Sequence, residues 1–240
     1  NVYSNLVNNI ESGALPYVIQ IEEKTNVNGF NFGLGLSFSK DSLGRRNDKR
    51  FSAGAVYSFG GKLKGKINRQ AIRTTIQGDT VERSPLSVVN GKVEIPSGLV
   101  FGISYAQGIK WMIGTEFSYQ DWSSLKSVNK DDEGLGEAWR VALGGEYTVD
   151  PNTVENYLKR ITFRAGLNLE RYPFFANNKP VNDFGINFGM SLPAGHSSVD
   201  IAFKYGKRGN RNENILEESY FKIFFGLTFN DQWFIKRKFD

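Results

Sequence analysis

The sequence contains no cysteine and a single histidine among its 240 residues. Disulfide frameworks, cysteine nucleophiles and zinc sites built from cysteine and histidine are therefore excluded. Long apolar runs are also missing: the mean hydropathy is −0.39, and no stretch approaches the roughly 18 apolar residues of a membrane-spanning helix. Phosphate-binding motifs of the GxGxxG or GxxxxGK[ST] type do not occur, so nucleotide cofactors have no support.

Glycine and aromatic residues are abundant, with 26 Gly, 19 Phe, 10 Tyr and 4 Trp. An apolar content of 40% is too high for a disordered chain. The net charge of +5 and the pI near 9.2 permit an anionic surface as partner without requiring one. Because the chain starts at Asn1 and not at Met, we expect that any targeting peptide is already absent.

Apolar side chains alternate with glycine or polar residues through segment 30–38, and the same pattern recurs at 184–192 and 221–229. A period of two is that of a β-strand with two different faces. Shorter or weaker versions cover 16–23, 51–75, 98–106, 109–121, 138–148, 160–171 and 198–206. The sequence predicts an all-β, antiparallel fold of about ten strands, with at most one short helical turn at 152–159.

The residues on the two faces distinguish a membrane barrel from a soluble sandwich. A sandwich carries long charged side chains on its outer face, whereas here ten glycines fall opposite the apolar rows, mixed with polar residues. Five apolar positions at two-residue spacing span about 26 Å, close to the apolar band of an outer-membrane barrel. We therefore predict a transmembrane β-barrel, with a soluble β protein as the alternative. Its aromatic girdle would comprise Trp111, Trp122, Trp139, Tyr147, Tyr205, Tyr220 and Trp233.

The lengths of the connections give an orientation, since such barrels have short periplasmic turns and long external loops. Residues 106–110 and 193–198 make short turns. Longer loops are predicted at 76–97, 123–136, 173–182 and 207–217. If the C-terminus is periplasmic, every short turn falls inside and every long loop outside.

Charged residues on the second face suggest one register between two strands. We pair segments 138–148 and 160–171 so that the numbers of two facing residues always add to 310. In this register two pairs of opposite charges face each other, and Leu143 faces Leu167. The charge pairs are Arg140 with Glu170 and Glu146 with Arg164. The predicted lumen charge network is Glu116, Arg140, Glu146, Arg164, Glu170, Asp200, Lys204 and Lys222. It is either a charged constriction or, more simply, a polar interior that neutralises itself.

Other chemistry has little support. Two carboxylates such as Glu116 and Glu146 would need unlike environments at a defined distance to act as acid and base, and His196 lies in a solvated turn. The acidic loop 129–134 lacks the ligand spacing of an EF-hand. Basic clusters at 45–50 and 207–211 are not interleaved with stacking aromatics, which argues against nucleic acid. No enzyme, cofactor or metal is predicted.

Segments 205–209, 217–221 and 226–238, together with 120–123, 145–147 and 164–167, resemble the long-chain-fatty-acid-transporter-like (FadL-type) outer-membrane barrels of Bacteroidota-like bacteria. The resemblance covers roughly residues 28–240. It implies a barrel of fourteen strands, an N-terminal hatch that plugs it, and passage of hydrophobic compounds. Some barrels of this fold are subunits of protein-secretion assemblies, so the fold alone does not decide the function.

The chain departs from that family in having about ten strands and no recognisable hatch. We expect that residues 1–240 form one outer-membrane barrel domain whose N-terminal part is missing, because residues 1–15 read as a mid-protein loop. Two functions remain open: a channel for hydrophobic small molecules such as fatty acids, and a barrel subunit of a secretion or assembly complex. The predicted partners are outer-membrane lipids, a hydrophobic ligand and other proteins of the complex.

Overall fold

The computed structural model describes residues 8–11, 17–44, 48–75, 77–128, 134–195, 197–211 and 216–229. Within these ranges the protein is built from strands, with two short 3-10 helices, and every strand pair whose register is resolved is antiparallel. The all-β, antiparallel class is confirmed. The described residues hold thirteen strands instead of about ten, and none of their helices is long and apolar enough to cross a membrane.

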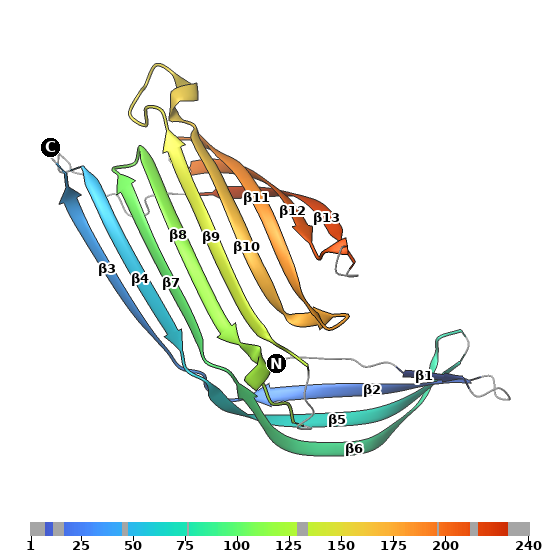
Figure 1. Cartoon of the computed structure of the whole chain (residues 1–240). Helices are drawn as coiled ribbons and strands as arrows, with labels where there is room; N and C mark the ends of the chain where they lie inside the picture. The colour runs from blue at the N-terminus through green and yellow to red at the C-terminus, as the bar shows by residue number, and fades with distance from the viewer. Residues whose placement is uncertain are drawn as a thin grey trace, which may run out of the picture. The chain divides into compact units, whose positions relative to one another are not determined.

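The larger sheet has nine strands, in the order β13-β12-β11-β10-β9-β8-β7-β4-β3 (Figure 1). Seven of them follow one another along the chain as neighbours, which is the simple up-and-down arrangement of antiparallel hairpins. The strands are β3 (Gly33–Leu43), β4 (Lys49–Ser58), β7 (Gly98–Gln107), β8 (Trp111–Asp121), β9 (Glu137–Thr148), β10 (Thr162–Ala176), β11 (Lys179–Ala194), β12 (Ser197–Arg208) and β13 (Glu218–Thr228).

The smaller sheet has four strands, in the order β1-β2-β5-β6. They are β1 (Asn8–Glu11), β2 (Tyr17–Asn28), β5 (Gly61–Thr75) and β6 (Thr80–Ile95). The sheet forms a compact unit with the segment 121–135, which contains the 3-10 helix η1 (Trp122–Ser124). The nine-stranded sheet forms the second unit.

Two sequence expectations about the smaller sheet are wrong. The single strand expected at 51–75 is interrupted at Phe59 and Gly60, and its halves are β4 and β5 in different sheets. A side chain at Gly60 would approach the carbonyl oxygen of Ile95 to 3.0 Å, so this break needs glycine. The external loop expected at 76–97 contains the 16-residue strand β6. The alternation of apolar and polar residues in β6 is not visible in the sequence, because the strand has many polar residues, contains Pro85 and is bulged where it pairs with β5.

Connection lengths also differ from expectation at two places. Only two residues, Asn177 and Asn178, join β10 to β11, and both have positive φ, 49° and 59°. Asparagine tolerates this conformation, which suits a tight hairpin turn, so the long loop at 173–182 is wrong. By contrast, 13 residues join β9 to β10 and include the 3-10 helix η2 (Tyr157–Arg160). The short turns at 106–110 and 193–198 are confirmed.

One face of the four-stranded sheet is covered by Val128. Gly65 and Gly91 pair across β5 and β6, and a side chain at either position would overlap Val128. Beside them Ile67 is only 3% exposed. The two glycines therefore form the flat seat that lets the segment after η1 pack onto this sheet.

Gly65→Ala is expected to destabilise the protein by about 1–3 kcal/mol, because the added methyl meets Val128 and approaches Val93 to 3.1 Å. Adding Val128→Ala removes the overlapping methyl, so the cost of Gly65→Ala falls in that background. The double-mutant cycle is measured by urea unfolding in detergent, followed by heat-modifiable gel mobility. Strictly additive costs would contradict this packing.

Candidate functional site

The strand register gives the nine-stranded sheet two unlike faces. Residues paired on adjacent strands share a face. One row reads Leu143, Leu167, Ile186, Tyr205 and Phe221 across β9 to β13. The next row, on the other side, reads Gly144, Gly166, Asn187, Lys204 and Lys222. We call these the apolar face and the polar face.

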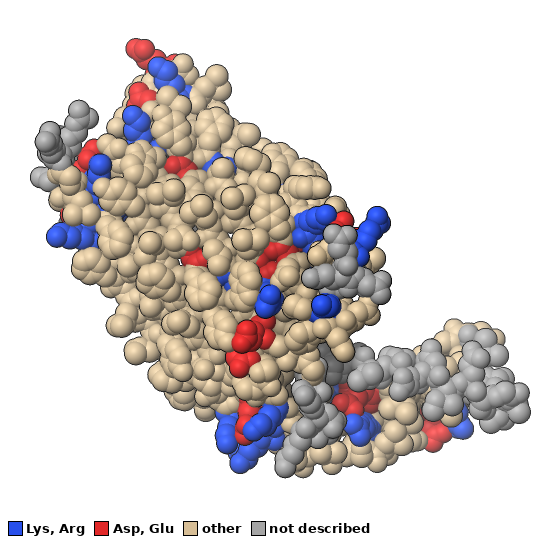
Figure 2. Space-filling model, viewed as in Figure 1, with Lys and Arg blue, Asp and Glu red and all other residues tan. Residues whose placement is uncertain are grey.

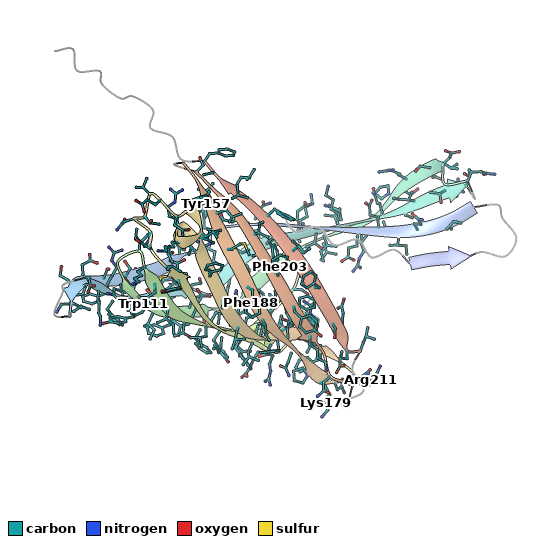
Figure 3. The ribbon with its side chains drawn as sticks, turned by 90° about the horizontal axis from the view of Figure 1, so that it is seen from above. Trp111, Tyr157, Lys179, Phe188, Phe203 and Arg211 are labelled. Carbon is teal, nitrogen blue, oxygen red and sulfur yellow. The ribbon has the colours of Figure 1, made fainter. Side chains whose placement is uncertain are left out.

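Large side chains of the apolar face are exposed. Phe225 is 77% exposed and Phe221 61%, and Phe188 pairs with Phe203 on the neighbouring strand (Figure 3). Leu143, Leu167 and Phe188 on this face are 48%, 44% and 60% exposed. By contrast, Figure 2 shows small groups of charged side chains over the strands of this sheet, as expected where its polar face is seen. Many large apolar side chains exposed on one face are unusual for a soluble monomer and fit contact with lipid.

The residues predicted for the aromatic girdle do not all lie on this face. Trp139 and Tyr147 pair with the apolar-face residues Arg171 and Phe163, and Tyr205 pairs with Phe221. The Trp111 indole donates a hydrogen bond of 2.8 Å to Gln107. Three positions differ: Trp122 belongs to η1 in the other unit, Tyr220 lies on the polar face, and Trp233 is outside the described residues.

The register predicted between β9 and β10 is confirmed: Arg164 pairs with Glu146, Glu170 with Arg140, and Leu167 with Leu143. The Arg164 guanidinium lies 3.1 Å from Glu146 and 3.1 Å from Asp200. It also donates to the hydroxyl of Ser191, which in turn donates to Asp200. One arginine therefore joins charges from β9, β10 and β12.

The other members of the predicted network are arranged differently. Glu116 pairs with Gly102 across β7 and β8. Lys204 and Lys222 face each other across β12 and β13, although like charges opposite one another are unfavourable. The Lys222 ammonium lies over the ring of Tyr220, at 4.8 Å from its centre, and Lys204 lies 3.9 Å from Asp183.

Asp183 organises a second cluster that the sequence analysis missed. Its side chain is fully buried. The Tyr220 hydroxyl lies 2.9 Å from both carboxylate oxygens, and the Arg208 Nε donates at 3.3 Å. Together with Lys204, these donors come from β12 and β13 to a carboxylate on β11. A buried carboxylate is costly without such partners, so this cluster fixes the three strands in register.

Two features support the cluster from its edges. Arg208 also donates to the hydroxyl of Tyr172 at 2.9 Å and lies 4.7 Å from the centre of its ring. Gly206 pairs with Tyr220, and a side chain there would overlap the tyrosine ring. The missing side chain at Gly206 lets Tyr220 lie across β12 and reach Asp183.

A hollow of about 690 Å³ lies along the polar face. Its floor is made of small residues, among them Gly102, Gly114, Gly144 and Gly166. Polar groups line it as well: Glu116, Arg140, Asn168 and Asn187. Much of the polar face thus carries no tall side chain, and this leaves room beside the sheet.

The remaining chemical candidates of the sequence analysis are a metal site and a carboxylate pair. Among the residues that the structure describes, no group of three or more His, Asp or Glu side chains could hold a metal ion. Three sets of predicted residues lie outside the described part of the chain: His196, residues 129–133 of the acidic loop 129–134, and Arg45 and Arg46 of the first basic cluster. Glu146, named above as one member of a possible carboxylate pair, is ion-paired with Arg164.

A broad antiparallel sheet with one exposed apolar face and one polar, glycine-lined face defines a protein of the outer-membrane β-barrel class. The chain belongs to the BamG family, whose model matches residues 3–240. Among solved structures it is similar to one described as the CymD monoaromatic hydrocarbon channel, with 15% identity, a TM-score of 0.43, and coverage of 92% of this chain and 71% of that chain. No curated protein matches the sequence.

Tyr220→Phe is expected to lower the free energy of unfolding by about 1.5–3 kcal/mol, because it removes a hydrogen bond to a buried charged carboxylate. Tyr205→Phe is the matched control: it removes a hydroxyl from the apolar face, where Tyr205 is 56% exposed, and it should change stability by less than about 0.5 kcal/mol. Urea unfolding in detergent measures both. Equal effects would show that the Asp183 cluster does not hold the strands together.

Proposed function

We propose that this chain is a non-enzymatic, membrane-embedded subunit of an outer-membrane protein-assembly complex. The observation that carries the proposal is its membership of the BamG family over residues 3–240. The nine-stranded sheet supplies the membrane-embedded part, because its apolar face offers exposed Phe and Leu side chains to lipid. The prediction of a FadL-like barrel remains part of this proposal.

In this proposal the polar face lines the interior of the barrel. The predicted network residues Glu116, Arg140, Glu146, Arg164, Glu170, Asp200, Lys204 and Lys222 then serve as a polar lining that is largely neutralised in place. The ion pairs of Arg164 and the donors around Asp183 support this interpretation. Trp139, Tyr147 and Tyr205 would contact the membrane interface from the other face.

The direction of the strands indicates which of their ends would face each side of the membrane. β3, β7 and β9 begin, and β4 and β8 end, where the chain passes to or from the unit of the four-stranded sheet. By alternation, the turn at 177–178, the end of β12 and the start of β13 lie at that same end. Figure 3 shows Lys179 and Arg211 at one end of the strands and Tyr157 at the other. With a periplasmic C-terminus, the strand ends that lead to the four-stranded sheet would lie on the external side.

The way the charged groups are used supports the proposed non-enzymatic role. General acid–base catalysis needs a titratable group free to exchange a proton with a substrate. Asp183 is occupied by Tyr220 and Arg208, and Asp200 by Ser191 and Arg164. In this proposal these carboxylates hold strands together and have a structural role.

Passage of hydrophobic small molecules is the second candidate function. The hollow of about 690 Å³ on the polar face favours it, because its glycine floor leaves space along the sheet. The polar groups that line this hollow, Glu116 and Arg140 among them, would make a poor path for a fatty acid unless another part of the protein covered them.

Purification in mild detergent from native outer membranes separates the two functions. An assembly subunit is expected to retain partner proteins at a fixed stoichiometry, whereas a channel would be purified alone with bound lipid. An unrelated tagged barrel from the same membranes controls for nonspecific association. Recovery of this chain alone, under conditions in which other membrane complexes survive, would contradict the subunit.

A further inference from the structure

The four-stranded sheet carries a row of lysines on one face. Lys62, Lys64 and Lys66 alternate along β5, so their side chains point to the same side. Lys92 on β6 pairs directly with Lys64 and adds a fourth ammonium group to that side. We call these four residues the lysine face; Lys64, Lys66 and Lys92 are exposed.

The opposite side of the same strands is closed. Gly65, Ile67 and Gly91 lie there, and Val128 packs onto it. Since its lysines are exposed, the lysine face is the open side of this sheet among the residues that the structure describes. Other charged residues that the register places on it are Lys24, Arg83, Glu22 and Glu94.

The carboxylates on this side do not neutralise the row. Glu94 lies 3.1 Å from Lys62 and 2.9 Å from Lys126, so two ammonium groups already share it. Glu22 is hydrogen-bonded to Gln70. Among the residues that the structure describes, no carboxylate lies within ion-pair distance of Lys64, Lys66 or Lys92.

Such an arrangement works against the folded sheet unless an anion is present. Like charges directly opposite each other, as at Lys64 and Lys92, destabilise a strand pair, and the lysines along β5 repeat at a spacing of about 7 Å. A ligand with several negative charges in one plane would relieve this repulsion. Lysine binds phosphate as a flexible point charge.

The position of the row in the chain favours a membrane surface as the source of that phosphate. Only Phe59 and Gly60 separate the end of β4, a strand of the nine-stranded sheet, from the start of β5. Clusters of basic residues directly adjacent to a membrane-spanning segment bind anionic headgroups. We propose that the lysine face binds the phosphate groups of anionic outer-membrane lipids, and so anchors the four-stranded sheet at the headgroup layer.

The proposal goes beyond the assembly role, and its test needs only the purified chain and lipids, with no partner protein. The full chain is purified in a neutral detergent, incubated with equal amounts of diphosphorylated lipid A and phosphatidylcholine, and examined by native mass spectrometry for retained lipid. The test variant is Lys64→Gln, Lys66→Gln, Lys92→Gln. The control variant, Lys110→Gln, Lys159→Gln, Lys179→Gln, removes the same charge from exposed positions on other elements.

The native chain and the control variant are expected to retain lipid A over phosphatidylcholine, and the test variant is expected to bind it at least about tenfold more weakly. Dephosphorylated lipid A should bind the native chain as weakly as phosphatidylcholine does. Retention by the native chain should fall steeply between low and high salt, a readout that does not depend on any variant folding.

Three results would overturn the proposal. Equal retention of lipid A by the test and control variants would show that clustering of the lysines is irrelevant. Equal retention of phosphorylated and dephosphorylated lipid A would exclude phosphate recognition. Tighter binding of poly-glutamate than of lipid A, lost in the test variant, would assign the lysine face to an acidic protein partner instead.

Discussion

The register of the antiparallel strands is the constraint on which the rest of the structure depends. In the nine-stranded sheet each backbone pairing fixes which side chains share a face, and a slip by one residue would exchange the two faces of a strand. A slip of β10 against β9 would bring Arg164 to the side of Leu143. The strands that pair after β10 would be shifted in the same way. Their charged side chains would then also lie among apolar side chains in lipid, which is energetically unfavourable.

The charged clusters hold this register at points where backbone hydrogen bonds alone would permit slippage. Arg164 links three strands through Glu146 and Asp200, and Asp183 links three through Tyr220 and Arg208. Glycines make these contacts geometrically feasible, since Tyr220 reaches Asp183 only across the bare backbone of Gly206. In the four-stranded sheet, Gly65 and Gly91 have a comparable role as the seat of Val128.

The sequence reveals those features that come from periodic patterns and misses those that come from single contacts. Alternation locates most strands of the larger sheet, and the two opposite-charge pairs suffice to predict the register of β9 with β10. β6 is missed because its polar residues and Pro85 break the pattern. The tight turn at Asn177 and Asn178 is missed because asparagine can adopt positive φ but does not have to, so the residue type alone does not mark the turn. The Asp183 cluster is missed because nothing in the spacing of Tyr172, Asp183, Arg208 and Tyr220 marks them as neighbours.

The central claim is that the apolar face of the nine-stranded sheet contacts lipid and the polar face does not. The natural absence of cysteine permits single spin labels without a background variant, placed in turn at Val199, Ile201, Phe203, Ser198, Ala202 and Lys204 of β12. In a bilayer, the first three labels should be more accessible to oxygen and the last three less so, in strict alternation. Equal oxygen accessibility at all six positions, or the opposite alternation, would contradict the account.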